Sequence, residues 1–189
     1  FGWSAGGMRR KMAAPCRIYV EGPPGTFHHV RADEPDGSAA PYSKQRPGSS
    51  ETHTTISAHP FVVDLAPGEY TLTAERGKEY FSSSLKVRLR DKPVKVSIKL
   101  RRWIDMTSRG WYSGDTPVHH SLSELPNIVL AEDLNLAFPL GYWVRAAFEP
   151  PAKGGQADLA ETAAKTARVD ATHLIWPRNT EYELFTVGG

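Results

Sequence analysis

Acidic and histidine side chains near the middle of the chain are the residues whose types and spacing suit metal chemistry. Asp115, His119 and His120 follow an apolar, aromatic stretch and precede a segment with helical spacing. Functional groups of α/β folds gather in this position, at the carboxyl ends of strands, and imidazole and carboxylate groups are common zinc ligands. The spacing alone leaves two interpretations open: a metal site, or a polar loop in which Asp115 caps a turn.

The other histidine and acidic residues are weaker candidates for metal ligands. Glu132 and Asp133 lie on the predicted helix behind residues 115–120, where a solvated helix face is the alternative to a metal role. His28 and His29 are adjacent on a strand-like piece, so their side chains point to opposite faces. For the four histidines before residue 60, an exposed or hydrogen-bonded imidazole is the preferred interpretation.

The first half of the chain has the alternating pattern of half-buried strands. Such alternation of apolar and polar residues occurs at 17–20, 60–65, 69–74, 85–90 and 94–100. The last segment is the most regular, with one apolar and one polar face. Residues 32–58, rich in Pro, Ser, Gly and Thr, are predicted to form a long polar loop. We therefore expect a small antiparallel β-sandwich over 14–102, after a flexible leader at 1–13.

After Trp103 the pattern changes to that of an α/β unit. A loop or strand end at 113–117, a helix capped by Ser123 with spacing continuing to Leu136, and a buried strand at 138–144 suggest a first βαβ unit. A solvated excursion follows, and then two more strands; these segments are 150–166, 173–176 and 182–187. The expected fold class is mainly β, with the β-sandwich followed by an incomplete α/β segment over 103–189.

Three segments of the second unit, at 103–106, 109–119 and 131–135, carry a resemblance to a known family. They resemble the join region of the CehA/McbA-type metallohydrolases, which belong to the PHP (polymerase and histidinol phosphatase) superfamily. In that family a β-sandwich of carboxypeptidase-regulatory type precedes a distorted βα barrel. The barrel opens with a Gly-Asp-x-His-x-His motif whose histidines bind catalytic divalent metal. The stretch 65–72 resembles the family's sandwich, and 177–183 resembles the segment that carries a later acidic ligand.

The resemblance implies a PHP-barrel-like unit that hydrolyses ester- or phosphoester-type bonds with a divalent metal, zinc or manganese. Carried over residue by residue, it makes His119 a metal ligand and Glu181, rather than Glu183, a further one. It also makes Asp115 a catalytic residue that orients a ligand.

The motif departs from the family at Pro117, where the first histidine is expected and where proline offers no donor atom. His120 cannot replace it, because neighbouring strand residues face opposite ways unless the strand bulges. The family's later ligands would lie beyond Gly189. We therefore expect the N-terminal portion of a metal-dependent hydrolase whose activity is impaired or absent in this chain.

The alternative is a non-catalytic β-sandwich that serves as a binding or assembly module, in contact with carbohydrate. Aromatic residues on a sandwich surface can stack on sugar rings, whereas packing between the two units is the competing interpretation. The aromatic residues concerned are Trp103, Trp111, Tyr112, Tyr142, Trp143 and Trp176.

Composition excludes some classes of partner and leaves the compartment open. The net charge of +2 and the scattered basic residues do not indicate nucleic-acid binding. No apolar run approaches the length of a membrane helix. The single cysteine, Cys16, is expected to be buried. A secreted or periplasmic protein after signal removal fits the start of the chain. Unpaired apolar edges at 138–144 and 182–187 predict a homo-oligomer.

Overall fold

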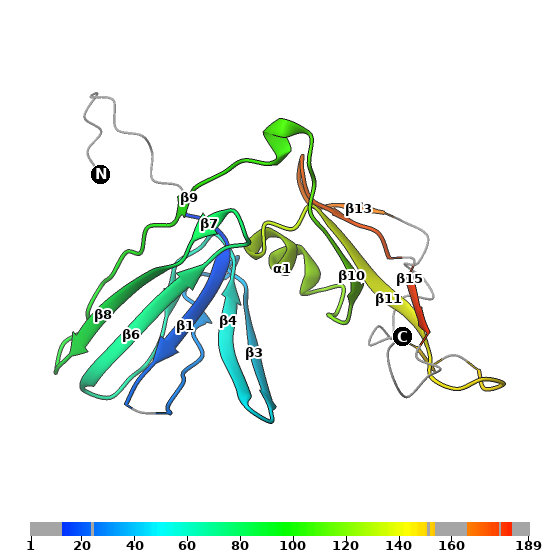
Figure 1. The fold of residues 1–189 in the computed structure, drawn as a ribbon. Helices are drawn as coiled ribbons and strands as arrows, with labels where there is room; N and C mark the ends of the chain where they lie inside the picture. Colours follow the sequence, from blue (N-terminus) through cyan, green and yellow to red (C-terminus); the bar gives the residue numbers. More distant parts are fainter. Residues whose placement is uncertain (1–12, 24, 151, 154–165, 178, 183–189) are drawn as a thin grey trace.

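The computed structural model describes residues 13–23, 25–150, 152–153, 166–177 and 179–182, and it is mainly β, as expected (Figure 1). The strands of the first unit are β1 (Cys16–Glu21), β2 (Arg31–Ala32), β3 (Ala39–Arg46), β4 (Ser49–Ile56), β5 (Phe61–Val62), β6 (Gly68–Glu75), β7 (Tyr80–Phe81), β8 (Ser83–Leu89) and β9 (Arg101–Arg102). After a 3₁₀ turn at Thr107–Arg109 come β10 (Gly114–Val118), α1 (Leu125–Ala131), β11 (Leu136–Val144), β12 (Ala152–Lys153), β13 (Ala167–Arg168), β14 (Leu174–Ile175) and β15 (Asn179–Tyr182).

The first unit is built on an antiparallel sheet of five strands in the order β3-β4-β1-β6-β8. The strands predicted at 17–20 and 69–74 lie within β1 and β6, and the strand predicted at 85–90 matches β8 except for Arg90, which follows its end. Alternate residues such as Ile18 and Leu72 face the core, where Cys16 is also buried and where burial raises the pKa of its thiol to about 11. The period-2 pattern therefore identified these strands correctly.

The second layer of the sandwich is less regular than predicted. The segment 60–65 contributes only the short β5, which pairs with β2. The segment 94–100, predicted to be the most regular strand, forms no ladder in the described structure. Its Val96, Ile98 and Leu100 nevertheless pack against the core. The alternation of buried and exposed side chains arises from packing on the sheet. Such packing does not require the segment to pair with a neighbouring strand.

The predicted long loop at 32–58 is wrong, because most of it forms the β3–β4 hairpin. The register runs from Ala39 opposite Ile56 to Arg46 opposite Ser49. A two-residue Pro47-Gly48 turn closes it, with Gly48 at φ 76°, a conformation that glycine adopts without strain. The threonine content of this segment, which we interpreted as typical of a loop, is instead typical of a strand, because residues with a branched Cβ atom favour strands.

Both faces of the five-stranded sheet are covered near β4. Residues 53–56 are all buried, as expected for a strand enclosed on two sides. One face packs on the sandwich core, and the other receives α1. The Asn127 side chain on α1 donates a hydrogen bond to the carbonyl of Thr55 at 3.1 Å. In Figure 1, α1 lies between the two sheets.

The second unit begins with the predicted βαβ unit. β10 and β11 pair in parallel, and α1 connects them. Leu125 and Val129 of α1 are fully buried against this second sheet, together with Ala137 and Ile175. The helix is shorter than predicted: its N-cap is Glu124 rather than Ser123, and it ends at Ala131.

The helix ends in a Schellman motif. The backbone N–H of Leu134 donates to the carbonyl of Val129, and that of Asp133 donates to Leu130. Asp133 adopts φ 49°, which stops the helix five residues before the predicted spacing does. Glu132 and Asp133 therefore do not lie on a solvated helix face.

β11 is the central strand of the second sheet. It pairs with β10 along one edge, with β14 and β15 in parallel, and with β12 in an antiparallel manner. Pro139, which lacks an N–H, sits where pairing changes from β14 to β15. The expectation of an unpaired edge at 138–144 is thus wrong, because neighbouring strands occupy both sides. The homo-oligomer remains a prediction.

Several sequence expectations lie outside the described residues. These are the flexible leader, apart from Ala13, and most of the excursion at 150–166 and of the strand at 182–187. Within the described ranges, no helix has the length and apolarity needed to cross a bilayer.

Ion pairs join the two units at the end of α1. Arg17 of β1 lies 2.9 Å from Glu132, and Arg76, just after β6, lies 2.8 Å from Asp133. His173 adds a contact of 3.7 Å from its Nε2 to the Asp133 carboxylate. The side chains of Arg76 and Asp133 are 13% and 12% exposed, so this pair is largely removed from water. These contacts fix the orientation of α1 on the sandwich.

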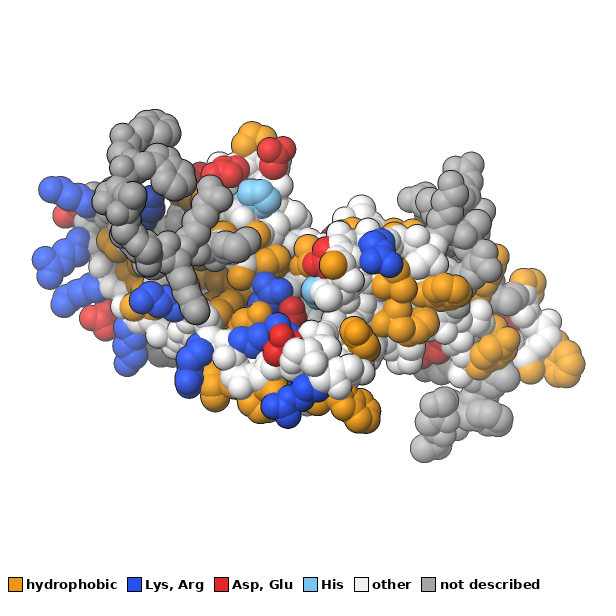
Figure 2. Space-filling model, turned by 90° about the horizontal axis from the view of Figure 1, so that it is seen from above, with side chains coloured by type: hydrophobic (Ala, Val, Ile, Leu, Met, Phe, Trp, Pro, Cys, Tyr) orange, Lys and Arg blue, Asp and Glu red, His pale blue; other side chains and the backbone are white. Residues whose placement is uncertain are grey.

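Basic side chains gather at the outer edge of the sandwich. Figure 2 shows Lys and Arg on the left-hand side, over the part of the molecule that holds β8. Exposed residues there include Lys86 and Arg88 on β8 and Lys95 and Lys99 beyond it. Because β8 is an edge strand, this charge opposes pairing with another chain along that edge.

Gly77→Ala is expected to destabilise the join between the units. A Cβ atom at Gly77 would lie 2.3 Å from the carbonyl oxygen of Glu132, too close for contact. Gly48→Ala is the matched control, because Gly48 also has positive φ but has nothing within 4 Å of an added Cβ. Urea unfolding should show that Gly77→Ala lowers the free energy of unfolding by about 1–3 kcal/mol more than Gly48→Ala does. Equal losses would mean that the close approach is easily relieved.

Asp133→Asn is expected to lower stability in a pH-dependent manner. Burial alone would raise the pKa of Asp133, but His173, Arg76 and Arg102 outweigh it and lower the pKa to about 2. The stabilisation is therefore complete above about pH 4 and is lost as pH falls through about 2. We expect the variant to lose at most about 2 kcal/mol at neutral pH, and about half as much at about pH 3.

Urea unfolding at the two pH values measures this difference for Asp133→Asn. Asparagine tolerates the left-handed conformation as well as aspartate does, so the substitution should not change the stability through the backbone conformation of residue 133. Asp64→Asn is the control, because the Asp64 side chain is 87% exposed in its pair with Arg31 and should contribute little. An equal loss at both pH values would contradict the expected titration.

Candidate functional site

Two of the residues predicted as metal ligands meet in the second sheet. His119 comes directly after β10, and Glu181 lies in β15. Both strands pair in parallel with β11. The Nε2 atom of His119 lies 3.2 Å from Oε2 of Glu181. The two residues lie far apart in the sequence, and the parallel sheet brings them together near the ends of the strands.

Trp143 lies beside both residues. It stands opposite Glu181 in the β11–β15 register. Its ring meets the His119 imidazole edge-on, with centroids 5.5 Å apart and an interplanar angle of 73°. The guanidinium of Arg145 lies over the same indole ring at 5.0 Å. The indole thus limits the orientations that the imidazole can adopt.

The polar atoms of this group lack ordinary hydrogen bonds. Glu181 Oε2 and Trp143 Nε1 are both buried without a hydrogen-bond partner among the described residues. The 3.2 Å contact from Glu181 to His119 is close, but it lacks hydrogen-bond geometry. An unpaired buried polar atom typically costs about 1–3 kcal/mol, so such atoms call for an explanation.

The donor set fits a divalent cation. With bonds of about 2.0–2.2 Å, two ligands of one tetrahedral zinc ion lie about 3.3–3.6 Å apart, which is close to the separation of 3.2 Å. A cation shared by the two atoms would also satisfy the buried Glu181 oxygen. Among the described residues, no group of three or more His, Cys, Asp or Glu is arranged to hold a metal.

Asp115 is not part of this pair. The β10–β11 register shifts between Asp115 and Val118, where three steps along β10 match two along β11. The extra residue is a β-bulge, which re-aims the side chains that precede it. As a result, Asp115 lines a cavity together with Val118 and His120, and its carboxylate contacts neither His119 nor Glu181 in the described structure. The bulge precedes His119, so His120 still faces away from the pair.

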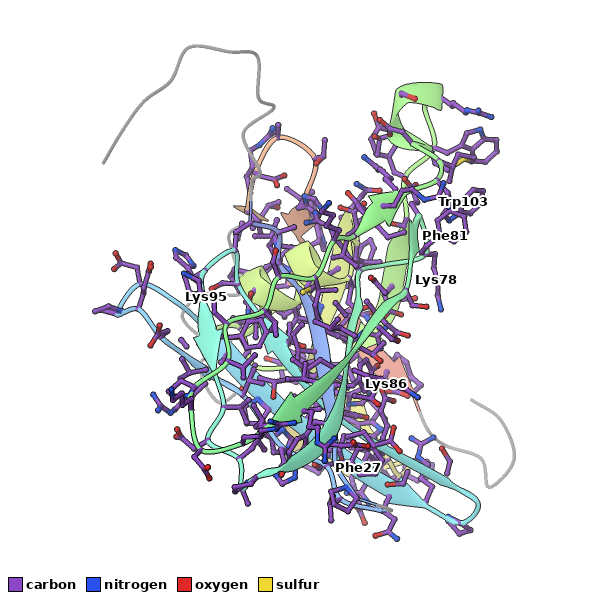
Figure 3. All side chains as sticks on the ribbon, turned by 90° about the vertical axis from the view of Figure 1, so that its left-hand side faces the viewer. Phe27, Lys78, Phe81, Lys86, Lys95 and Trp103 are labelled. Atoms are coloured by element: carbon purple, nitrogen blue, oxygen red, sulfur yellow. The ribbon has the colours of Figure 1, made fainter. Side chains whose placement is uncertain are left out.

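The aromatic residues are mostly not packed between the units. Exposed fractions of 56% for Trp103, 68% for Trp111 and 66% for Tyr112 contradict that interpretation, and Tyr142 and Trp176 are also exposed. Figure 3 shows Trp103 beside Phe81, and their ring centroids lie 6.4 Å apart. The indole N–H of Trp103 donates to the carbonyl of Lys78 at 3.0 Å, which holds the ring in place.

Sequence reasoning missed the residues that face α1 from the β3–β4 hairpin. Tyr42, Glu51 and His53 lie in the segment interpreted as a loop, yet His53 is buried and Tyr42 stacks on it. The signal was present in the run Thr52-His53-Thr54-Thr55-Ile56, which is rich in β-branched residues, and in the Pro47-Gly48 turn before it.

Comparisons with models of protein families, with curated proteins and with solved structures returned no match for this chain.

Proposed function

We propose that this chain is part of a divalent-metal-dependent hydrolase that acts on ester- or phosphoester-type bonds, with His119 and Glu181 as metal ligands. The observation that carries the proposal is the buried, unpaired Oε2 of Glu181, 3.2 Å from Nε2 of His119. The resemblance to CehA/McbA-type enzymes supports it separately, because it implies that both residues are metal ligands without using their contact.

The roles of the protein groups follow from their contacts. His119 and Glu181 would hold a zinc or manganese ion, and Trp143 would keep the imidazole in a narrow range of orientations. When bound, the ion would polarise the substrate oxygen and lower the pKa of a bound water. Catalytic zinc sites have three protein ligands, and proline at position 117 contributes none. We therefore propose weak metal binding and impaired activity.

His119→Ala and Glu181→Gln should each weaken zinc or manganese binding by about ten-fold or more, because each removes one of the two ligands. Isothermal titration of the full chain with either metal measures the affinity. His28→Ala and Glu69→Gln are the matched controls, since they change the same residue types on the sandwich and should leave the affinity unchanged.

The metal proposal would be wrong if neither metal binds at millimolar concentration, or if the affinity is the same in the ligand variants as in the controls. In either case, His119 and Glu181 would form only an ion pair.

We propose as a second candidate that the sandwich binds carbohydrate at the Phe81–Trp103 surface. The supporting observation is a pair of exposed rings whose positions are fixed by neighbouring groups. Besides the Trp103 hydrogen bond, the guanidinium of Arg101 lies over the Phe81 ring at 4.4 Å. The exposed face of a fixed aromatic ring offers a planar apolar surface for a sugar ring at little cost in conformational entropy.

Trp103→Ala should abolish retardation of the protein in native gels that contain soluble polysaccharide, because it removes the larger ring. Phe27→Ala is the control, since Phe27 is also exposed but lies at the far end of the sandwich (Figure 3). Native gels with a panel of neutral and acidic polysaccharides provide the measurement. Absence of retardation in every gel, or equal retardation of both variants, would overturn this candidate.

A further inference from the structure

A cavity lies on the side of β10 that faces away from His119. It occupies about 390 Å³ and is lined by residues of the β3–β4 hairpin, of α1 and of the end of β10. This volume falls within the range of small-molecule sites, which often lie between two units of a protein.

Carboxylates outnumber cationic groups around this cavity. Glu51, Asp115, Glu124 and Glu132 line it, whereas Arg17 supplies the single guanidinium or ammonium group among the described residues of its wall. The Arg17 charge is already shared, at 2.9 Å from Glu132, 3.4 Å from Glu51 and 3.6 Å from a glutamate outside the cavity. The remaining negative charge creates a potential that attracts cations.

His53 presents an unpaired nitrogen in the cavity wall. Its side chain is only 8% exposed, and its Nδ1 lies 3.1 Å from Oε1 of Glu51 without hydrogen-bond geometry. Burial first, and then the charge of Arg17, lower the pKa of His53 to about 4, so the imidazole is neutral at neutral pH. A neutral imidazole has one nitrogen that accepts a hydrogen bond. A ligand that donates N–H would suit this place beside a carboxylate.

The rest of the wall is aromatic and apolar. The Tyr42 ring stacks on His53, with centroids 4.9 Å apart and an interplanar angle of 23°. Aromatic faces attract cations within about 6 Å. Ile128 and Leu134, which are both partly exposed, supply a hydrocarbon surface. This combination suits a ligand with a cationic end and a short alkyl chain better than a bare metal ion, which requires several oxygen or nitrogen ligands at short distance.

We propose that this cavity binds a small aliphatic amine, with the ammonium group held by the carboxylates of Glu51 and Asp115 and by the Tyr42 ring, and with its alkyl chain against α1. The site is separate from the His119–Glu181 pair and does not depend on the metal proposal.

Isothermal titration of the full chain with 1,5-diaminopentane tests the proposal. We expect saturable binding of the diamine and none of 1,5-pentanediol, which has the same chain length without charge. Asp115→Asn and Tyr42→Leu should each weaken binding about ten-fold. Asp115 is exposed and forms no described ion pair, so its substitution should not affect folding. Glu69→Gln, an exposed carboxylate outside the cavity, is the matched control.

Three outcomes would overturn the amine site. They are no diamine binding at millimolar concentration, equal affinity in Asp115→Asn, Tyr42→Leu and Glu69→Gln, and displacement of the diamine by an equal concentration of magnesium. His119→Ala should retain amine binding, which distinguishes failure of this site from failure of the metal site.

Discussion

The ion pair between Arg76 and Asp133 is the contact on which the arrangement of the two units depends. Asp133 ends α1 in a left-handed conformation, which glycine would adopt with less strain, and the chain turns from there into β11. The carboxylate gives the residue a function that glycine lacks, because it joins the helix end to Arg76 of the sandwich. Gly77 follows Arg76 and leaves room for the Glu132 carbonyl. Asp133 thus combines a strained backbone conformation with an ion pair to a residue that is distant in the sequence.

Much of the fold could be predicted because its signals are local. The strands β1, β6 and β8 each have one face that is more buried than the other, so alternation along the sequence is sufficient to find them. The βαβ unit was visible because strand, proline-initiated helix and apolar strand follow in order. The pairing of His119 with Glu181 was anticipated only through a family resemblance, since no local pattern relates residues so far apart.

The remaining features depend on tertiary contacts that leave weak traces in sequence. The end of β4 is buried on both faces by the core and by α1, so it lacks the alternation expected of a strand. The segment 94–100 has that alternation but pairs with no strand among the described residues. Asp133 ends the helix through a positive φ, which aspartate adopts only when its surroundings favour it. Exposure of Trp103 and Trp111 could not be inferred either, because large aromatic residues occur both in cores and on binding surfaces.

Because of the bulge in β10, side chains of this strand and of the residues directly after it face two separate sites. Asp115 and His120 line the cavity beside α1, whereas His119 points to Glu181. Because strand side chains alternate, loss or gain of one residue between Asp115 and Val118 would exchange the side chains that face each environment. The length of this short segment is therefore constrained more strictly than its composition. Substitutions there can be absorbed one at a time, but an insertion or deletion would alter both environments at once.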